Sequence, residues 1–197
     1  MSDKPNIILV GAGGHCAACI DVIEQENRFQ IIGITDREAS SDSVCGYPVL
    51  GDDTRLAKLS SQADYALITV GQIGSPQTRM RLYEFIRSLG FTLPVVVSPL
   101  AYVSPHAQLG AGTIVMHHAL INARAKVGEN CIINSKALIE HDVQVADHCH
   151  IATAAVINGG AVIGLGSFVG SNAVIIKNTP EHAFIKAGSL FKGNQHD

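Results

Sequence analysis

Tryptophan is absent from this chain of 197 residues, and aromatic residues make up only 5% of it. A core with so few rings must be filled mainly by branched aliphatic side chains, as in a solenoid. The chain also lacks a run of about eighteen apolar residues that could cross a membrane. The segment Met1–Asn6 is too polar to be part of a signal peptide. We therefore expect a soluble, cytoplasmic protein with no membrane partner.

Cysteine pairs with CxxC spacing and clusters of basic residues are missing as well. The five cysteines are an odd number, which favours buried, reduced thiols over a disulfide framework. The formal net charge is only −3, and no basic segment is interleaved with aromatic residues. The composition therefore argues against nucleic acid as a partner.

The sequence does contain a repeat of six residues. Val, Leu or Ile occupies every sixth position from Val97 to Ile175, fourteen times without a break. The residue four places after each of them is small or compact, from Ala101 to Thr179. This period matches neither the 3.6 residues of an α-helix nor the two of a strand, and it indicates the hexapeptide class of parallel β-helix.

In such a β-helix, three hexapeptides form one triangular coil. The aliphatic first residue of each hexapeptide points into the core, and the small fifth residue fits the corner where the chain turns. Polar residues at the third, fourth and sixth places must then face outward. We therefore predict an all-β parallel β-helix over residues 97–197, with any chemistry on its outer wall.

The N-terminal part begins with a pattern of strand, glycine turn and helix. An apolar run, Asn6–Val10, is followed by the glycine-rich segment Gly11–His15 and then by helical spacing over Cys16–Glu26. Glycines at such a turn let the N–H groups of a helix N-terminus approach a phosphate. The dinucleotide fingerprint has a third glycine where this chain has Cys16, which argues against NAD. We predict a Rossmann-like α/β nucleotide-binding domain over residues 1–96.

Acidic and basic residues of this domain are further candidates for nucleotide contacts. Asp36 and Arg37 follow a second predicted strand, Phe29–Thr35, at the place where an acidic residue meets a ribose or base. A solvated acid in a loop would fit the position of Asp36 equally well.

Three more elements complete the domain: a helix that Asp52 caps and that runs to Leu59, a strand Tyr65–Val70, and a helix Gln77–Ser88. On the last helix, Arg79 and Arg81 could reach a phosphate. A solvated helix face is the favoured interpretation of both residues.

Histidines gather on the predicted outer wall of the β-helix. His141 occupies the third place of its hexapeptide between Glu140 and Asp142, and a carboxylate can hold an imidazole in one tautomer as a general base. Such a base suits acyl transfer from a thioester, which needs no covalent nucleophile. A zinc site is the alternative, and its candidate ligands are His141, His148, His150, His117 and His118. It is less favoured because HxxH and HExxH spacings are absent, so no metal is expected.

The chain resembles a known family over nearly its whole length. The segments that carry the resemblance are GAGGH at residues 11–15, GYPVLGD at residues 46–52, and N-S-x-x-x-I-E-H at residues 134–141. They are similar to those of the NeuD/PglD-type bacterial sugar acyltransferases. The resemblance implies a left-handed β-helix, a homotrimer with active sites between subunits, acetyl-CoA as donor, and a nucleotide-linked sugar held by the N-terminal domain.

The resemblance also assigns roles to individual residues. It implies that His141 is the catalytic base, that Asp142 orients it, and that Asn134 contacts the substrate. The residues that it associates with the acetyl donor are His150 and, through its backbone amide, Gly159. Cations that could pair with CoA phosphates are Lys177, Lys186 and Lys192. Nucleotide contacts would come from Gly11, Gly13, Gly14, His15, Asp36 and Arg37.

These observations favour an acetyl-CoA-dependent N-acetyltransferase. Its acceptor would be the 4-amino group of a UDP- or TDP-linked deoxy-aminosugar used in a surface glycan or glycoprotein. An O-acetyltransferase of sialic acid is the first alternative, because the same scaffold could activate a hydroxyl. A non-catalytic solenoid scaffold is the second.

Overall fold

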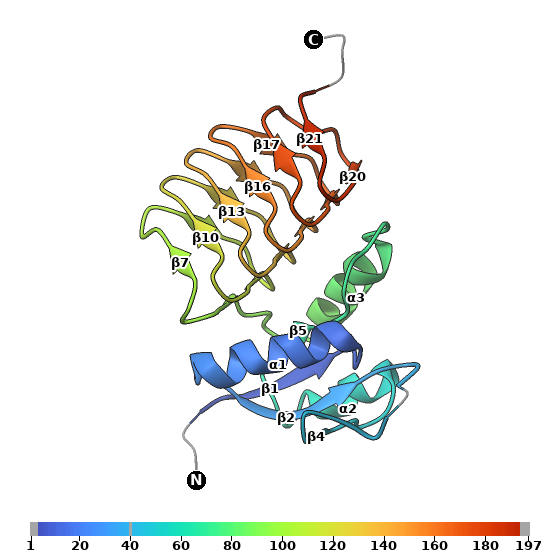
Figure 1. Cartoon of the computed structure of the whole chain (residues 1–197). Helices are drawn as coiled ribbons and strands as arrows, with labels where there is room; N and C mark the ends of the chain where they lie inside the picture. Colours follow the sequence, from blue (N-terminus) through green and yellow to red (C-terminus); the bar gives the residue numbers. More distant parts are fainter. Residues whose placement is uncertain (1–3, 40, 194–197) are drawn as a thin grey trace.

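The computed structural model describes residues 4–39 and 41–193. The chain forms an N-terminal α/β part followed by a parallel β-helix of about five coils (Figure 1). The predicted fold class is confirmed, including the left-handed sense of the β-helix. Residues 1–3, 40 and 194–197, which the predicted domains 1–96 and 97–197 include, lie outside the described residues. None of the helices within the described ranges combines the length and the apolar character needed to cross a membrane.

The N-terminal part is built on a parallel three-stranded sheet in the order β2-β1-β5. Its strands are β1 (Asn6–Val10), β2 (Gln30–Thr35) and β5 (Tyr65–Ile68). Its helices are α1 (Gly14–Glu26), the short η1 (Asp53–Arg55), α2 (Leu56–Leu59) and α3 (Gln77–Ser88). A small antiparallel hairpin, β3 (Ser43–Val44) and β4 (Tyr47–Pro48), follows β2.

The central strand β1 explains why this sheet has helices on both faces. Ile7 and Leu9 pack in one cluster with α1, whereas Ile8 and Val10 pack in another with α2 and α3. A strand that is buried on both faces is read in the sequence as a continuous apolar run, as β1 is. The predicted elements are therefore present, although α1 begins at Gly14, two residues before the predicted start at Cys16.

The β-helix has three faces, each a parallel sheet whose strands come from successive coils. Face 1 consists of β6 (Val96–Val97), β9 (Ile114–Val115), β12 (Ile132–Ile133), β15 (His150–Ile151), β18 (Phe168–Val169) and β20 (Phe184–Ile185). Face 2 consists of β7 (Tyr102–Val103), β10 (Leu120–Ile121), β13 (Leu138–Ile139), β16 (Val156–Ile157), β19 (Val174–Ile175) and β21 (Leu190–Phe191). Face 3 consists of β8 (Gln108–Leu109), β11 (Lys126–Val127), β14 (Gln144–Val145) and β17 (Val162–Ile163).

The core of the β-helix contains the residues that the six-residue period placed there. The aliphatic first positions from Val115 to Ile175 are buried in one cluster, together with the apolar fifth positions from Ala119 to Ala173. The polar fifth residue in this range, Ser167, is buried as well. In the first coil Val97, Val103 and Leu109 are only partly buried, because no coil precedes it.

Backbone geometry at the corners is set by the fourth place of the hexapeptides. From His118 to Asn172, the residues at this place that are not glycine have positive φ, for example Asn130 at 52° and Asp142 at 62°. A left-handed residue turns the chain sharply, and it costs a non-glycine residue about 1–3 kcal/mol that the surrounding packing must offset. The turn leaves the side chains at the third and fourth places outside the core.

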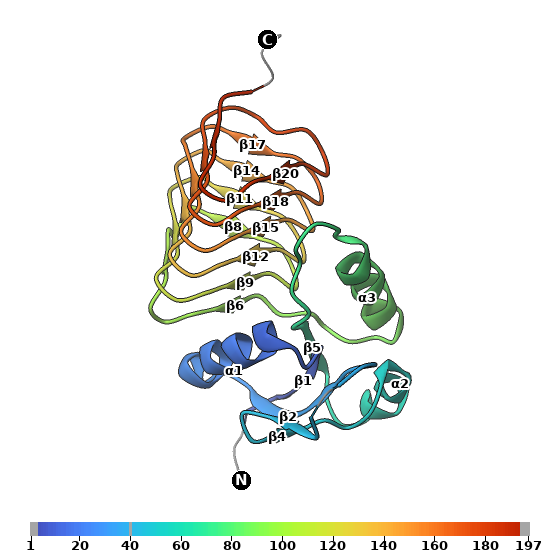
Figure 2. The same cartoon turned by 45° about the vertical axis from the view of Figure 1, so that its right-hand side comes forward.

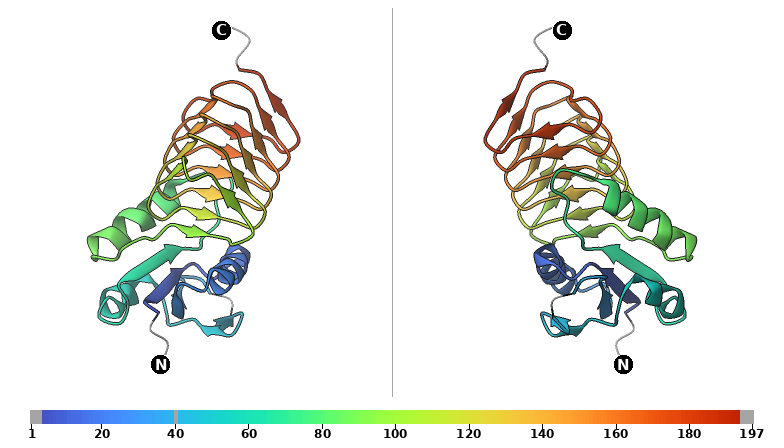
Figure 3. Two further views of the ribbon diagram at one scale, coloured as in Figure 1. Left: turned by 90° about the vertical axis from the view of Figure 1, so that its left-hand side faces the viewer. Right: turned by 90° about the vertical axis from the view of Figure 1, so that its right-hand side faces the viewer.

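The N-terminal part packs against face 1 of the β-helix. Helix α1 lies between its own sheet and the first coil, and α3 stands beside face 1 (Figures 2 and 3). The outward side chains Val96, Ile114 and Ile132 belong to the same buried cluster as the apolar residues of α1. Because that cluster is continuous, the two parts share a core.

The β-helix extends beyond the predicted repeat, which ends at Pro180. Phe184 pairs with Phe168, so this coil has two residues fewer than the preceding one, in which Phe168 pairs with His150. Face 3 stops at β17, where Val162 and Gly164 donate their N–H groups to the side chains of Asn178 and Thr179 and not to a further strand. The shortened coil brings β20 and β21 onto faces 1 and 2 only.

Candidate active site

The turns that join face 2 to face 3, which we call the 2/3 corner, stack into columns of equivalent residues. His141 occupies the third place of its turn, with Ala123 in the coil before it and Gly159 in the coil after it. Asp142 occupies the fourth place, one coil after Arg124. The sequence repeat thus sets which side chains meet across coils.

The imidazole of His141 is oriented by the neighbouring carboxylate. His141 Nδ1 lies 2.8 Å from Asp142 Oδ2, and because a carboxylate only accepts, Nδ1 carries the proton and Nε2 keeps its lone pair. Both side chains are open to solvent, with exposed fractions of 59% and 41%. This arrangement can accept a proton at Nε2 from a bound acceptor.

Asp142 is itself held by a residue that the sequence did not single out. Arg124 donates from Nε to Oδ1 at 2.6 Å and from Nη2 to Oδ2 at 2.8 Å. The hydrogen bonds from Arg124 and then His141 hold the pKa of the Asp142 carboxyl well below its usual range. The signal for Arg124 was present, because a spacing of 18 residues is one coil.

The other flanking carboxylate has a different role. Glu140 Oε2 accepts from Asn122 Nδ2 at 2.9 Å and from the backbone N–H of His141 at 3.3 Å. Glu140 therefore stabilises the backbone of the turn, whereas Asp142 orients the imidazole of His141.

Gly159 forms the floor beneath the imidazole. A Cβ atom at this position would lie 2.8 Å from both Cε1 and Nε2 of His141. The next residue, Gly160, donates its N–H to the carbonyl of His141 at 2.9 Å. Within the described residues, the Gly159 N–H has no acceptor, so it is available to a ligand.

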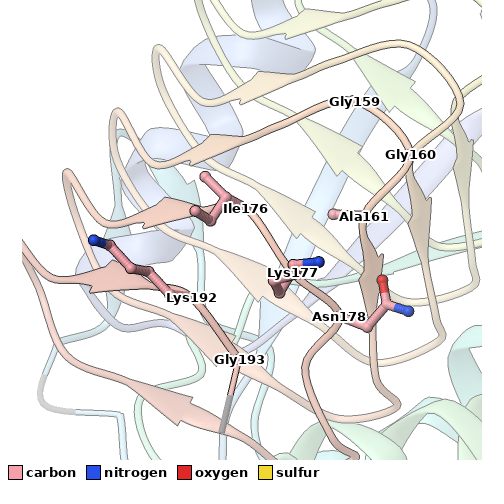
Figure 4. A pocket seen from close by; sticks show the side chains of 8 residues that line it. All are labelled: Gly159, Gly160, Ala161, Ile176, Lys177, Asn178, Lys192 and Gly193. Carbon is pink, nitrogen blue, oxygen red and sulfur yellow. The ribbon is translucent and has the colours of Figure 1, made fainter. Parts of the chain in front are cut away.

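A cavity of about 440 Å³ continues from Gly159 along the 2/3 corner. Lys177 and Lys192 line it from the last two coils (Figure 4). Both are cations and can pair with phosphate oxygens. Lys186, predicted with them, follows β20 at the turn from face 1 to face 2 and does not line this cavity.

His150 and Asn134 form a second group, on another part of the β-helix. His150 Nδ1–H donates to the carbonyl of Gln72 at 2.6 Å, and its Nε2 accepts from Asn134 Nδ2 at 3.1 Å. Burial of His150, which is only 7% exposed, is the main cause that lowers its pKa to about 4. His150 lies on the outer wall of the β-helix, outside its core, but the loop with Gln72 covers it, so the imidazole is not open to solvent.

His150 and His141 do not meet within one chain. His150 lies on face 1, and Asn134 follows face 1 at the turn to face 2. His141 follows face 2 at the turn to face 3. The width of face 2 therefore separates the two groups in a single protomer.

The glycine turn and the N-terminus of α1 form a third group. Gly11 is required by a close approach, since a Cβ atom there would lie 2.5 Å from Val70 Cγ2 and 2.7 Å from the Val70 nitrogen. At Gly13 and Gly14 a Cβ atom would meet nothing within 4 Å. With no acidic residue in the first turn and no side-chain cap, the N–H groups there suit an anion.

Asp36 and Arg37 border a cavity beside this turn. Asp36 accepts from the N–H groups of Ala12 at 2.6 Å and of Glu38 at 2.7 Å, which orients its carboxylate toward the glycine turn. The cavity, of about 310 Å³, is also lined by Asp53 and Arg81. Arg81 is exposed, in line with the favoured interpretation of a solvated helix face, and it also lies where it can contact a ligand in this cavity.

His15 is close to the glycine turn but enclosed. Burial, followed by the charge of Arg79, lowers the pKa of His15 to about 3. Its Nε2 is buried without a hydrogen-bond partner among the described residues. His15 is therefore neutral.

Arg79 departs most from expectation. It is 1% exposed, and both the solvated helix face and the contact with a phosphate predicted from the sequence are wrong for it. Its guanidinium donates to carbonyls at the end of β5 and to Asn130 of the β-helix. The helical pattern around Arg79 could not predict its burial, because its partner Asn130 comes from a coil that is distant in the sequence.

The histidines proposed as alternative zinc ligands have separate partners. His117 bonds Ser98 Oγ through Nδ1 at 2.7 Å and Asp21 Oδ2 through Nε2 at 2.6 Å. His148 Nδ1 accepts from Asn130 Nδ2 at 3.0 Å. Among residues 4–39 and 41–193, no three His, Cys, Asp or Glu side chains gather closely enough to hold a metal ion.

Comparison with known proteins gives the family context of this geometry. The family model described as the PglD N-terminal domain matches residues 6–86. A structure of a histidine mutant of perosamine N-acetyltransferase from Caulobacter crescentus, in complex with CoA and GDP-perosamine, is 30% identical. The alignment covers 94% of this chain and 87% of that one, with a TM-score of 0.88.

Two further structures are of the acetyltransferase domain of PglB from Neisseria gonorrhoeae. One is 27% identical with a TM-score of 0.89, and the alignment covers 98% of this chain and 94% of that one. The other holds acetyl coenzyme A and is also 27% identical, with a TM-score of 0.85. That alignment covers 96% of this chain and 94% of that one. An uncharacterized protein of Acanthamoeba polyphaga mimivirus is 27% identical over 115 residues, which are 58% of this chain. The matched residues span only 22% of the length of that curated relative.

Proposed function

This chain belongs to the PglD/NeuD-type family of sugar acetyltransferases, and we propose that it transfers the acetyl group of acetyl-CoA to the amino group of a nucleotide-linked deoxy-aminosugar. The observation that carries the proposal is the position of His141. Its Nδ1 is held by Asp142, and its Nε2 lies against the backbone of Gly159, whose N–H has no acceptor among the described residues. We infer that this base and this N–H act together at the mouth of a lysine-lined cavity.

The chemistry follows from these groups. The acceptor amine loses a proton to His141 Nε2 as its nitrogen attacks the thioester carbonyl carbon, and the new C–N bond forms. The N–H of Gly159 stabilises the negative oxygen of the tetrahedral state. The C–S bond then breaks, and CoA leaves as the thiol after taking up a proton. A thioester is already activated, so no covalent enzyme intermediate is required.

The donor is assigned to the cavity along the 2/3 corner. Lys177 and Lys192 supply cations there for the phosphates of CoA, and the PglB relative was solved with acetyl coenzyme A bound. Lys186 and His150 do not line this cavity within one chain. Their contacts with CoA stay predictions.

The nucleotide of the acceptor is assigned to the N-terminal part. The free N–H groups at Gly13 and Gly14 would hold a phosphate, and the cavity with Asp36, Arg37 and Arg81 would hold the nucleoside. The sequence favours the 4-amino group of a UDP- or TDP-linked sugar, whereas the Caulobacter relative was solved with a GDP-linked one. The identity of the nucleobase and the position of the amino group on the sugar are therefore tested together, with a panel of nucleotide-linked amino sugars.

A homotrimer with shared sites is the assembly that we propose. The outward side chains of face 2 form an apolar column, namely Tyr102, Leu120, Leu138, Val156, Val174 and Leu190. The equivalent column on face 3 begins with Gln108, Lys126 and Gln144. An apolar face on an outer wall favours burial against another copy. A second copy there would close the open site at His141.

The function is tested by thiol release from acetyl-CoA with UDP-, TDP- and GDP-linked 4-amino sugars and with sialic acid. We expect turnover with one of the amines, and His141→Ala should lower kcat by about 10²–10⁴. His106→Ala, an exposed histidine at the same corner in the first coil, is the matched control and should stay within about twofold of wild type. Unchanged turnover in His141→Ala would refute the assignment of the base.

A thermal shift separates the enzyme from a scaffold. CoA at a hundred times its Kd should stabilise the folded state by about 2.7 kcal/mol. A non-catalytic solenoid would show no such shift. Turnover with sialic acid but with no amine would favour the O-acetyltransferase alternative.

A further inference from the structure

Arg79 is a buried cation without an anionic partner. Its Nη1 donates to the carbonyls of Ile68 at 3.0 Å and Val70 at 2.7 Å. Its Nη2 donates to Asn130, to the carbonyl at 3.2 Å and to Oδ1 at 2.6 Å. No carboxylate among the described residues forms an ion pair with Arg79. Burying an unpaired charge is costly in free energy. The burial of Arg79 therefore needs an explanation other than a gain in local stability.

The four acceptors belong to two different parts of the molecule. Ile68 and Val70 mark the end of β5 in the N-terminal sheet, and Asn130 lies at the turn from face 3 to face 1. Asn130 is fully buried with a φ of 52°, and its Nδ2 donates back to the carbonyl of Arg79 at 3.2 Å. The planar guanidinium therefore fixes the end of β5 against one coil.

The loop that starts from this fixed point reaches His150. Gln72, two residues after Val70, donates from Nε2 to the carbonyl of His148 at 2.9 Å. Its own carbonyl accepts from His150 Nδ1 at 2.6 Å. That bond places the proton on Nδ1, so His150 Nε2 can only accept, and it accepts from Asn134 Nδ2.

The charge of Arg79 favours neutral imidazoles nearby, whereas the hydrogen bond to the Gln72 carbonyl acts the other way and raises the pKa of His150. After burial itself, the nearby guanidinium contributes to lowering the pKa values of His15, to about 3, and of His150, to about 4. The pKa of His148 shifts downward too, mainly through burial. The bond that Nε2 accepts from Asn134 requires a neutral His150, and the bond to the Gln72 carbonyl fixes its proton on Nδ1.

We propose that Arg79 is a positioning residue for acetyl transfer: by holding Val70 and Asn130 together, it fixes the Gln72 carbonyl against His150 and so sets the orientation in which His150 and Asn134 meet the substrates. This rests on the proposed function and on the predicted roles of His150 at the acetyl donor and of Asn134 at the substrate. Arg79 itself touches neither substrate.

Three variants isolate the role. Arg79→Met removes all four donor contacts and keeps an apolar side chain of similar length. Arg79→Lys keeps the charge but lacks the planar fork that serves two acceptor sites at once. Arg87→Met is the matched control, because Arg87 lies on the same helix, has a side chain that is 53% exposed and pairs with Glu129 at 3.6 Å.

The first readout needs no turnover. The imidazole ¹⁵N signals of ¹⁵N-histidine protein report the tautomer of each histidine, and His150→Gln identifies the signals of His150. Wild type and Arg87→Met should show the Nδ1–H tautomer for His150. In Arg79→Met the two nitrogen shifts should move toward a mixture of tautomers. An unchanged His150 signal in folded Arg79→Met would overturn the proposal.

The second readout is kinetic. Arg79→Met should lower kcat by about 10- to 100-fold, in line with the cost of a small misplacement in an active site. KM for the nucleotide sugar should change less than about threefold, and Arg79→Lys should recover only part of kcat. A loss of thermal stability with kcat unchanged would mean that Arg79 is merely structural and would refute the positioning role.

A milder variant keeps the proposal testable if Arg79→Met does not fold. Gln72→Ala removes only the bond to His148 and should shift the His150 signals and lower kcat by about three- to tenfold. Wild-type signals and rates in Gln72→Ala would contradict the proposal. If wild type shows no acetyl transfer at all, the proposed function fails, yet the tautomer measurement still reports on Arg79, so the two failures are distinguishable.

Discussion

The imidazole of His141 rests directly on Gly159, so closely that a Cβ atom on Gly159 would come within 2.8 Å of His141 Nε2. The two residues are one coil apart at the 2/3 corner, at equivalent places of their hexapeptides. The register of the β-helix therefore brings the backbone of Gly159 directly against the base nitrogen of His141.

Gly159→Ala should consequently damage catalysis more than folding. The added methyl group displaces the imidazole or covers the N–H, and we expect kcat to fall by about 10²-fold or more. Gly159 does not have the positive φ of its neighbour Gly160, so alanine is not strained there and Tm should change little. A Gly159→Ala enzyme with wild-type kcat would show that the imidazole does not work in this position.

Arg124 should matter through Asp142. Arg124→Met removes both bonds to the carboxylate, which then holds His141 less firmly, and we expect kcat to fall by about tenfold with little change in KM. Asp142→Asn should cost more, about 10²-fold, because the amide no longer provides an anionic acceptor for Nδ1–H. Steady-state kinetics decide this. Equal, wild-type rates for both variants would rule out an orienting role for Asp142.

The buried histidines predict how stability depends on pH. The folded pKa is about 4 for His150 and about 3 for His15, whereas an unfolded histidine titrates near 6.5. Between these values the unfolded chain binds more protons, so the free energy of unfolding falls as the pH falls. Each of these two imidazoles should lower the free energy of unfolding by about 2 kcal/mol between pH 7 and pH 5.

Urea denaturation at the two pH values measures this change. His150→Gln should weaken the pH dependence by the share of one imidazole, while carboxylates with lowered pKa values, such as Asp142, act only at lower pH. If His150→Gln keeps the full pH dependence, the imidazole of His150 is not one of its sources.

The apolar column of face 2 predicts the assembly. Leu138→Glu places a charge in the middle of that column, and we expect the trimer to dissociate in light scattering with loss of most activity. Gln144→Glu on the polar face 3 is the control and should leave the assembly unchanged. A monomeric wild type, or a trimeric and active Leu138→Glu, would argue against face 2 as the interface.

The sequence by itself determined the β-helix. A period of six dictates which residues are buried, and a coil length of three hexapeptides then dictates which outward residues stack, so that Arg124 above Asp142 and His141 above Gly159 follow from local spacing. The strand, glycine turn and helix at the N-terminus were likewise readable, because β1 is buried on both faces and Gly11 has no room for a side chain.

Only the tertiary structure decided how the two parts meet, and with that the surroundings of His150, His15 and Arg79. A pattern within one helix cannot show that Arg79 will find Asn130, 51 residues away, instead of water. Nor can it show that the loop with Gln72 will cover His150 and fix its tautomer. These contacts depend on the docking of the N-terminal part against face 1, in which α1 shares an apolar core with the first coils, and not on any local repeat.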